Sequence, residues 1–401
     1  MMPIRRASIL IVAALAVAAF APERAVAFGS PLHIFGPNRL ERVNAKIGGR
    51  VCDYTNNHGV DRRICSKALD EKRDLYVYLP PGYDGKTRFP FMLWLHGFGH
   101  DEKNFLSFVP HLDEGIRTGA LPPMVIVAPD GSFKARPAIF NTGSFYLNTK
   151  AGRYEDYIAE DIVGFALKNF AIRPEREAHV IAGASMGGYG AYSFGFKHKE
   201  LFGNIAGIMP SLSMRYLDCN GKYSTDYDHN CVSLRTEFPR NEVVGRFYGV
   251  ILVRQRRMLD PLFGRHNKED VFATLSANNP IELLETRNVQ PDDYKLFIGY
   301  AGKDEFNLDA QAEHFIDVAG KRGIRPTILK IDEGHHNVKT GVRMFPEMAR
   351  WLKPLIEPYA PANYSGTAGN SSAVLHAPQL GAFGRPLYLA PMPAAPTTLR
   401  W

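Results

Sequence analysis

The chain has 401 residues, of which 45% are hydrophobic and 22% charged, with 28 Pro and 36 Gly. This composition excludes a disordered chain, a collagen and a low-complexity protein, and the length suffices for one large domain or two smaller ones. Lys and Arg number 48 against 41 Asp and Glu, which gives a net charge of +7. Because these charges are scattered rather than gathered into runs, the sequence gives little support for nucleic-acid binding.

Residues 1–27 have the pattern of a secretory signal peptide. A basic start, MMPIRR, precedes the apolar run ASILIVAALAVAAF, and the AVA that ends at Ala27 has the form of a cleavage site. Pro22, Glu23 and Arg24 interrupt the apolar run before the ~18 residues that a membrane-spanning helix needs. The sequence therefore predicts an exported protein, periplasmic or extracellular, with no membrane span after cleavage.

The four cysteines form two close pairs, Cys52 with Cys65 and Cys219 with Cys231, each in polar, loop-like sequence. Because exported proteins commonly carry disulfides, two local disulfides are predicted. Crossed pairing and free thiols stay open, since four cysteines allow three connectivities. Neither pair has the short C-x2-4-C spacing of structural zinc sites, which disfavours a metal site.

Short apolar runs alternate with helical patterns between residues 70 and 357. The predicted strands are residues 75–79, 91–95, 124–128, 180–183, 205–209, 296–300 and 327–331. The predicted helices are residues 102–118, 154–170, 187–199, 308–321 and 338–355. Such alternation predicts an α/β domain, with a mostly parallel sheet and helices on both of its faces.

Three segments depart from this alternation. Residues 28–69 form an N-terminal segment that carries Cys52 and Cys65, and residues 358–401 form a Pro-, Ala- and Gly-rich stretch that is predicted to be a flexible tail. Residues 211–279 contain a Cys-bounded loop and an Arg-rich segment with a helical pattern. This stretch is either a cap-like insertion over the C-terminal edge of the sheet or an ordinary crossover helix with a long surface loop.

The sequence GASMG follows a predicted strand and opens a predicted helix, which is the context of a G-x-S-x-G nucleophile. The motif places Ser185 on a sharp turn, where Gly183 and Gly187 leave room for neighbouring elements. A Gly-rich phosphate-binding turn is the alternative, but the segment has neither the dinucleotide-binding spacing nor the lysine of a P-loop. Ser185 is therefore the predicted nucleophile.

A serine nucleophile needs a general base and an acid that orients the base. Candidates follow two later predicted strands: Asp304 and Glu305 in AGKDEFN, and His335 and His336 in DEGHHN. The order serine, acid, histidine is the one that α/β-hydrolases use. We choose Asp304 and His336, with Glu305 and His335 as the neighbouring alternatives.

The developing oxyanion also needs hydrogen-bond donors. The sequence WLHGFG follows the predicted strand at residues 91–95, so its backbone can turn an N–H toward the reacting carbonyl. The N–H of Met186, directly after the nucleophile, is the second predicted donor. A tight turn with no role in catalysis is the alternative for the HG pair.

The segments LWLHGFG, AGASMGGYGAY, AGKDEFN and EGHHNVKT, with the preceding YVYLPPGYD, resemble the putative-esterase family of α/β-hydrolases over about residues 70–355. That family includes feruloyl and acetyl-xylan esterases, S-formylglutathione hydrolases, enterochelin-type esterases and mycolyltransferases. The resemblance implies an α/β-hydrolase fold in which Ser185 is the nucleophile, Asp304 the acid and His336 the base. It implies no metal and no cofactor.

The same resemblance implies further residues of the site. It assigns the oxyanion donors to the backbone of Phe98 and of Met186, and it places Tyr146 and Asn148, in the segment GSFYLN, near the substrate cleft. Many members of the family have an aromatic residue shortly after the histidine, where this chain has NVK. The pocket wall at that point therefore differs from theirs.

These residues predict an exported serine esterase that hydrolyses carboxylic esters through an acyl-enzyme, without a cofactor. Its predicted partner is a small-molecule or polymer-linked ester. Two alternatives stay open. One is a secreted acyltransferase with the same triad, which would exclude water from the acyl-enzyme, and the other is a non-catalytic binding protein on the same fold.

Overall fold

The computed structural model describes residues 37–133, 143–247, 249–265, 268–362 and 364. The predicted signal peptide and almost all of the predicted tail lie outside these residues. The chain divides into residues 1–38 and 39–401, and the fold below is that of the second unit. Every helix within the described ranges is too short or too polar to cross a membrane.

Eight strands form the central sheet: β1 (Arg50–Tyr54), β4 (Leu75–Leu79), β5 (Phe91–Leu95), β6 (Val125–Pro129), β9 (His179–Ala184), β10 (Asn204–Ile208), β15 (Lys295–Ala301) and β16 (Thr327–Ile331). Their order is β1-β4-β6-β5-β9-β10-β15-β16. The pairs from β6 to β16 are parallel, whereas β1 and β4 join antiparallel at one edge. The seven predicted strands are confirmed. The edge strand β1 was not predicted, because Arg50 and Asp53 interrupt its apolar residues.

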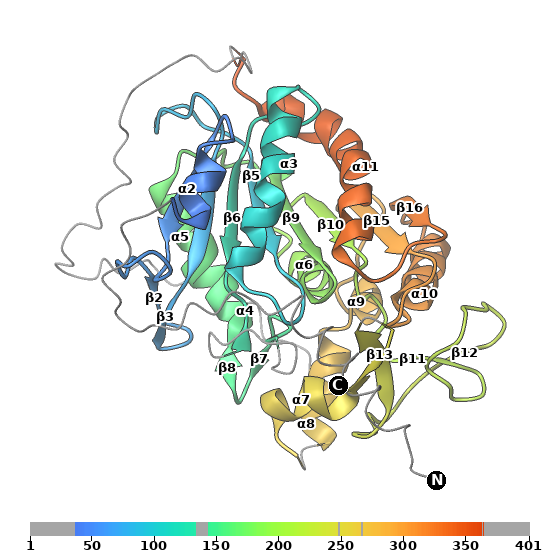
Figure 1. Cartoon of the computed structure of the whole chain (residues 1–401). Helices are drawn as coiled ribbons and strands as arrows, with labels where there is room; N and C mark the ends of the chain where they lie inside the picture. Colours follow the sequence, from blue (N-terminus) through green and yellow to red (C-terminus); the bar gives the residue numbers. More distant parts are fainter. Residues whose placement is uncertain (1–36, 134–142, 248, 266–267, 363, 365–401) are drawn as a thin grey trace, which may run out of the picture. The chain divides into compact units, whose positions relative to one another are not determined.

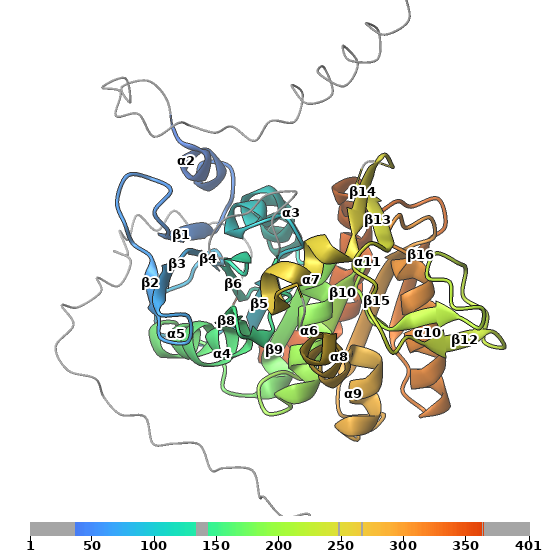
Figure 2. The ribbon, with the colours of Figure 1, turned by 90° about the horizontal axis from the view of Figure 1, so that it is seen from below.

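Helices cover both faces of this sheet, as Figures 1 and 2 show. Alternate residues of a strand face the two layers: Leu93 joins one hydrophobic core, whereas Met92 and Trp94 join the other. One layer contains α2 (Arg39–Asn44), η1 (Glu102–Asn104), α3 (Phe105–Arg117) and α11 (Val338–Ile356). The other contains α4 (Tyr154–Asp156), η3 (Tyr157–Val163), α5 (Gly164–Asn169), α6 (Met186–Lys197), α9 (Pro280–Thr286) and α10 (Leu308–Lys321). The predicted helices are confirmed, and the α/β architecture with them.

The remaining elements are short. They are β2 (Ile64–Ser66), β3 (Glu71–Arg73), β7 (Asn148–Thr149), β8 (Gly152–Arg153), η4 (Arg176–Ala178) and η5 (Glu357–Tyr359). Two antiparallel pairs form here, β2 with β3 and β7 with β8. Arg73, the last residue of β3, is fully buried.

Residues 211–279 build a separate group of elements: β11 (Tyr216–Asp218), β12 (Val232–Leu234), β13 (Val243–Phe247), β14 (Ile251–Arg254), α7 (Gln255–Phe263) and α8 (Lys268–Ala277). β11 pairs with β12 and β13 with β14, both antiparallel. The Arg-rich segment begins as a strand and becomes helical only at Gln255. The β-branched Ile251 and Val253 favour the strand, and β13 supplies its hydrogen-bonding partner.

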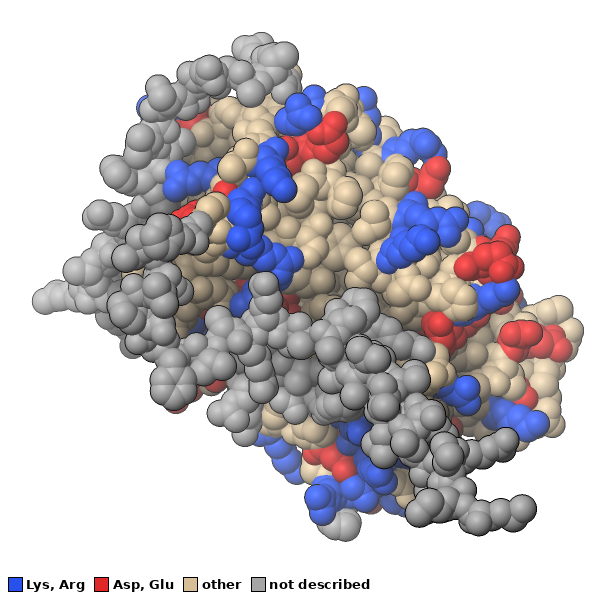
Figure 3. All heavy atoms as spheres, viewed as in Figure 1, with Lys and Arg blue, Asp and Glu red and all other residues tan. Residues whose placement is uncertain are grey.

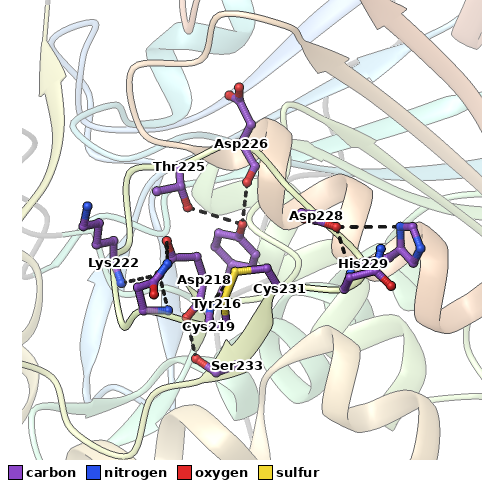
Figure 4. Close-up of a disulfide and its surroundings, with 12 residues drawn as sticks. Tyr216, Asp218, Cys219, Lys222, Thr225, Asp226, Asp228, His229, Cys231 and Ser233 are labelled. Carbon is purple, nitrogen blue, oxygen red and sulfur yellow. Dashed lines mark hydrogen bonds and ion pairs between the residues drawn. A yellow bond between two sulfur atoms is a disulfide. The ribbon is translucent and has the colours of Figure 1, made fainter.

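One of the two predicted disulfides is present, between Cys219 and Cys231, next to β11 and β12 (Figure 4). The prediction for Cys52 and Cys65 is wrong, because both thiols are free. Cys52 is buried on β1, whereas Cys65 is exposed on β2. Burial raises the pKa of Cys52 to about 11, so its thiol stays protonated at neutral pH.

Basic and acidic side chains are interspersed over the described part of the face in Figure 3, as the scattered charges of the sequence indicate. Ion pairs also form along helices: Lys321 lies 2.7 Å from Asp317 on α10, and Lys353 lies 3.9 Å from Glu357 at the end of α11. Exposed pairs of this kind contribute about 0–1 kcal/mol. These pairs therefore add little to stability.

Candidate active site

Ser185 lies on the turn between β9 and α6 with φ 55° and ψ −115°. Residues other than glycine rarely adopt a positive φ, so the surrounding structure must hold Ser185 in this conformation. The N–H of Ser185 donates to the carbonyl oxygen of Ile208 at 2.9 Å. A Cβ on Gly187 would lie 2.0 Å from the carbonyl oxygen of Leu95, and one on Gly183 would lie 2.4 Å from the Gly187 carbonyl. Only glycine fits at either position, which explains the spacing of the motif.

His336 and Asp304 reach Ser185 from loops that follow β16 and β15. The Nε2 atom of His336 lies 3.0 Å from the Ser185 hydroxyl, and Nδ1 lies 2.8 Å from the Asp304 carboxylate. Because Nδ1 faces a carboxylate, it carries the proton, and Nε2 presents its lone pair to the serine. The carboxylate of Asp304 is fully buried, and its second oxygen accepts the N–H of Phe306 at 2.9 Å.

The neighbouring alternatives occupy different places. The side chain of His335 is 52% exposed, and its Nδ1 lies 2.8 Å from the Glu305 carboxylate. The other oxygen of Glu305 accepts the backbone N–H of His336, also at 2.8 Å. Glu305 therefore braces the histidine loop through its backbone, while Asp304 contacts the ring that faces Ser185.

The pKa shifts of His336 and Glu305 agree with these different contacts. Burial of the His336 ring disfavours the imidazolium, but the charge of Asp304, the hydrogen bond that this carboxylate accepts from the ring and the charge of Glu305 together raise the pKa of His336. Burial would also raise the pKa of Glu305, yet the hydrogen bonds from His336 and His335 lower it. A positive charge on the His336 ring is thus stabilised by the two neighbouring carboxylates.

Phe98 and Met186 line the same cavity as Ser185. Within the described part of the chain, neither backbone N–H donates to an acceptor. A Cβ on Gly97 would lie 3.5 Å from the Cβ of Ser185, so the loop after β5 lies directly against the nucleophile. Both residues therefore lie at the cavity wall close to Ser185, and Met186 lies at the positive end of the α6 dipole.

A cavity of about 350 Å³ opens beside Ser185. Rings connect its walls: Phe98 stacks on Phe247 with centroids 6.5 Å apart, Phe247 lies 5.2 Å from Phe306, and Phe306 lies 5.0 Å from the His336 ring. Residues 211–279 contribute much of the apolar lining, among it Met214, Phe238, Val244, Phe247, Val253 and Met258. Sequence reasoning missed these residues, because their positions depend on the fold of that segment. No group of three His, Cys, Asp or Glu side chains suited to a metal ion occurs among the described residues.

Two residues predicted near the cleft lie elsewhere. Tyr146 is buried, and its hydroxyl donates to the carbonyl oxygen of His96 at 3.0 Å, while its neighbour Phe145 lines the cavity. The side-chain oxygen of Asn148 accepts the N–H of Glu155 at 3.0 Å, within α4. The structure therefore brings neither side chain to the wall beside Ser185.

A family model described as a putative esterase matches residues 66–337. The chain belongs to this esterase family. Membership makes it a carboxylic ester hydrolase, and the large parallel sheet with helices on both faces is an α/β-hydrolase fold.

Solved structures with this fold have low sequence identity to the esterase. A ferulic acid esterase is 17% identical, with 77% of this chain and 99% of that chain covered and a TM-score of 0.55. A fluorophosphonate-binding serine hydrolase of Staphylococcus aureus is 16% identical, with 76% and 98% covered and a TM-score of 0.53. An S-formylglutathione hydrolase from Agrobacterium tumefaciens is 16% identical, with 77% and 96% covered and a TM-score of 0.53. The shared property is the fold.

Proposed function

We propose that the chain is a serine esterase with Ser185 as nucleophile, His336 as general base and Asp304 as the acid that orients the base. The hydrogen-bonded chain from Ser185 through His336 to Asp304, with contacts of 3.0 and 2.8 Å, carries this proposal. The Ser185 oxygen bonds to the ester carbonyl carbon while its proton passes to Nε2 of His336. The same proton then leaves with the alcohol, and an acyl-enzyme remains.

Water completes the cycle. It attacks the acyl-enzyme, gives a proton to His336 and releases the acid, and the histidine returns the proton to Ser185. During both steps the backbone N–H groups of Phe98 and Met186 donate to the oxyanion. One such donor contributes roughly 10²–10³ in rate.

The lining of the cavity supports an ester with an apolar acyl group. The volume falls within the ~300–1,000 Å³ of small-molecule sites, and the walls are mostly aromatic rings and methionine or aliphatic side chains. Apolar surface removed from water contributes about 25 cal/mol per Å², so longer acyl groups gain binding energy until the cavity is filled. The substrate is thus a small-molecule or polymer-linked ester whose apolar acyl group enters this cavity.

Export is part of the proposal. The signal-peptide pattern of residues 1–27 and the disulfide between Cys219 and Cys231 support a periplasmic or extracellular enzyme. N-terminal sequencing of the exported protein should begin at Phe28. Recovery of the full chain from the cytoplasm alone would contradict export.

The test is hydrolysis of p-nitrophenyl esters from acetate to palmitate by the protein that begins at Phe28. Ser185→Ala should fall to background, and His336→Gln and Asp304→Asn should each lower kcat by about 10³–10⁴. The adjacent substitution His335→Gln is the matched control and should retain most of the activity. Equal rates for wild type and Ser185→Ala would overturn the proposal. An added alcohol or sugar acceptor separates hydrolysis from acyl transfer.

A further inference from the structure

A buried guanidinium, that of Arg73, contacts the residues that follow β6. The side chain of Arg73 is fully buried, and its Nη2 donates to the carbonyl oxygens of Asp130 at 2.8 Å and Ser132 at 2.7 Å. The same nitrogen lies 3.0 Å from the Asp130 carboxylate. Burial disfavours the cation, but Asp130, Tyr157, Tyr154 and Glu71 together outweigh the burial and raise the pKa of Arg73. The guanidinium is therefore charged at neutral pH.

The ring of His96, which is only 3% exposed, lies next to the Asp130–Gly131 peptide. Its Nε2 lies 2.8 Å from the backbone N–H of Gly131, and its Nδ1 lies 2.9 Å from the carbonyl oxygen of Gly97. An N–H needs an acceptor and a carbonyl oxygen needs a donor, so these partners fix the neutral tautomer with its proton on Nδ1. The Asp130 carboxylate is farther from Nε2, at 3.7 Å, and accepts the N–H of Ser132 at 2.8 Å.

Two peptide groups join these side chains into one chain. In a trans peptide the C=O and the N–H point in opposite directions. Arg73 holds the carbonyl of the Asp130–Gly131 peptide, so the N–H of that peptide points to His96. His96 in turn holds the carbonyl of the Gly97–Phe98 peptide, so the N–H of Phe98 points away from His96. Gly97 lies against Ser185, and Phe98 lines the catalytic cavity.

We propose that Arg73, His96 and these two peptides form a hydrogen-bond relay that orients and polarises the Phe98 N–H toward the oxyanion, with His96 as a positioning residue. The inference rests on the proposed function. Every link donates in the same direction, from the guanidinium toward the active site, and aligned hydrogen bonds strengthen one another by about 10–30% per bond. The relay thus extends the electrostatics of the oxyanion site to a cation that no substrate touches.

Tyr146 contacts two members of the relay, His96 and Gly131. Its hydroxyl donates to the carbonyl oxygen of His96 at 3.0 Å. Its ring lies so close to Gly131 and Gly190 that a Cβ there would be 2.2 and 2.5 Å from ring atoms. A residue predicted to line the pocket therefore contacts two members of the relay instead.

Three substitutions separate the orientation of the Phe98 N–H from its polarisation. His96→Ala removes both contacts, and kcat should fall about 10²–10³-fold, as for loss of one oxyanion donor, with KM nearly unchanged. In His96→Asn the side-chain amide still donates to the Gly97 carbonyl but accepts nothing from Gly131, so kcat should recover at least tenfold over alanine and stay below wild type. Tyr146→Phe keeps the ring and should lower kcat several-fold.

Tyr192→Phe is the matched control, because the Tyr192 hydroxyl also donates to a backbone carbonyl, that of Phe297 at 2.9 Å, outside the relay. This variant should have the kcat of wild type. The rate of phosphonylation by a fluorophosphonate probe should follow kcat across the series, since that reaction also develops negative charge at the oxyanion site. Melting temperatures, measured in parallel, separate these effects from loss of folded protein.

Some outcomes would overturn the relay. It fails if His96→Asn and Tyr146→Phe both have the kcat of wild type, a comparison that stands even where His96→Ala does not fold. It also fails if KM rises at constant kcat, or if Tyr192→Phe loses as much activity as Tyr146→Phe. Ser185→Ala is assayed beside them. Residual activity in Ser185→Ala would overturn the proposed function. If Ser185→Ala is inactive but the His96 variants have the kcat of wild type, the relay alone is overturned.

Discussion

Two effects oppose each other at the ring of His336: burial lowers its pKa, whereas the charge of Asp304 raises it. Asp304 and Glu305 prevail, and the pKa of His336 is raised above its ordinary value. As the pH falls through that pKa, the ring gains a proton and no longer accepts one from Ser185. The acid limb of kcat/KM should therefore have its midpoint above ~6.5.

Asp304→Asn removes the charge and leaves the burial in place, so the midpoint of the acid limb should move to lower pH in the residual activity. Profiles of kcat/KM against pH for the two proteins check the sign. A midpoint that moves to higher pH in Asp304→Asn would contradict the role of that carboxylate.

The close approach of Ser185, Asp304 and His336 could be predicted from sequence, because each follows a strand that ends at the same edge of the sheet. Phe145 and Tyr146 could not be placed in this way. Both have positive φ, 52° and 55°, so the backbone does not alternate there as in a strand and no sequence pattern indicates which ring faces the cavity. The relay through His96 was also missed, because Arg73 and Gly131 are distant from it in sequence.

The packing of α6 against β5 depends on a glycine. A Cβ on Gly187 would meet the Leu95 carbonyl oxygen at 2.0 Å, whereas one on Gly164 in α5 would have no atom within 4 Å. Gly187→Ala should lower the free energy of unfolding by about 2 kcal/mol or more through overpacking. Gly164→Ala should raise it by ~0.5–1 kcal/mol, because alanine suits a helix better. Urea denaturation compares the two, and equal effects would contradict the close approach of α6 to β5.

The disulfide next to β11 and β12 closes a short loop, with a sequence separation of 12 from Cys219 to Cys231. Replacing both cysteines by serine should lower the free energy of unfolding by up to about 3 kcal/mol in the chain-entropy model. Cys65→Ser, at an exposed free thiol, should change it little. A reducing agent should lower the Tm of wild type but not of the double variant, and an equal shift in both would show that the bond does not support the fold.

Most elements of the α/β domain were predictable, because strands buried on both faces read as continuous apolar runs between turn residues. The segment 211–279 was not, since its strands are short and pair only with each other. Yet this segment contacts the catalytic loops: the N–H of Arg246 donates to the carbonyl oxygen of Glu305 at 3.2 Å, and Gly245 lies against Phe306. The segment thus packs against the loop that carries Asp304.

Phe247 tests the role of this segment in substrate choice, because its ring connects Phe98, after β5, to Phe306, after β15. Phe247→Ala removes apolar surface from the cavity wall, so longer acyl esters should lose more kcat/KM than acetate does. Burying a phenylalanine contributes about 1.5–3 kcal/mol, so the ratio of kcat/KM for octanoate to that for acetate should fall roughly tenfold or more. Val250→Ala, in the same hairpin but 77% exposed, should leave the ratio unchanged. If the two variants had the same ratio, the hairpin would not contact the acyl group, and acyl selection would lie with the walls from α3, α6 and α11.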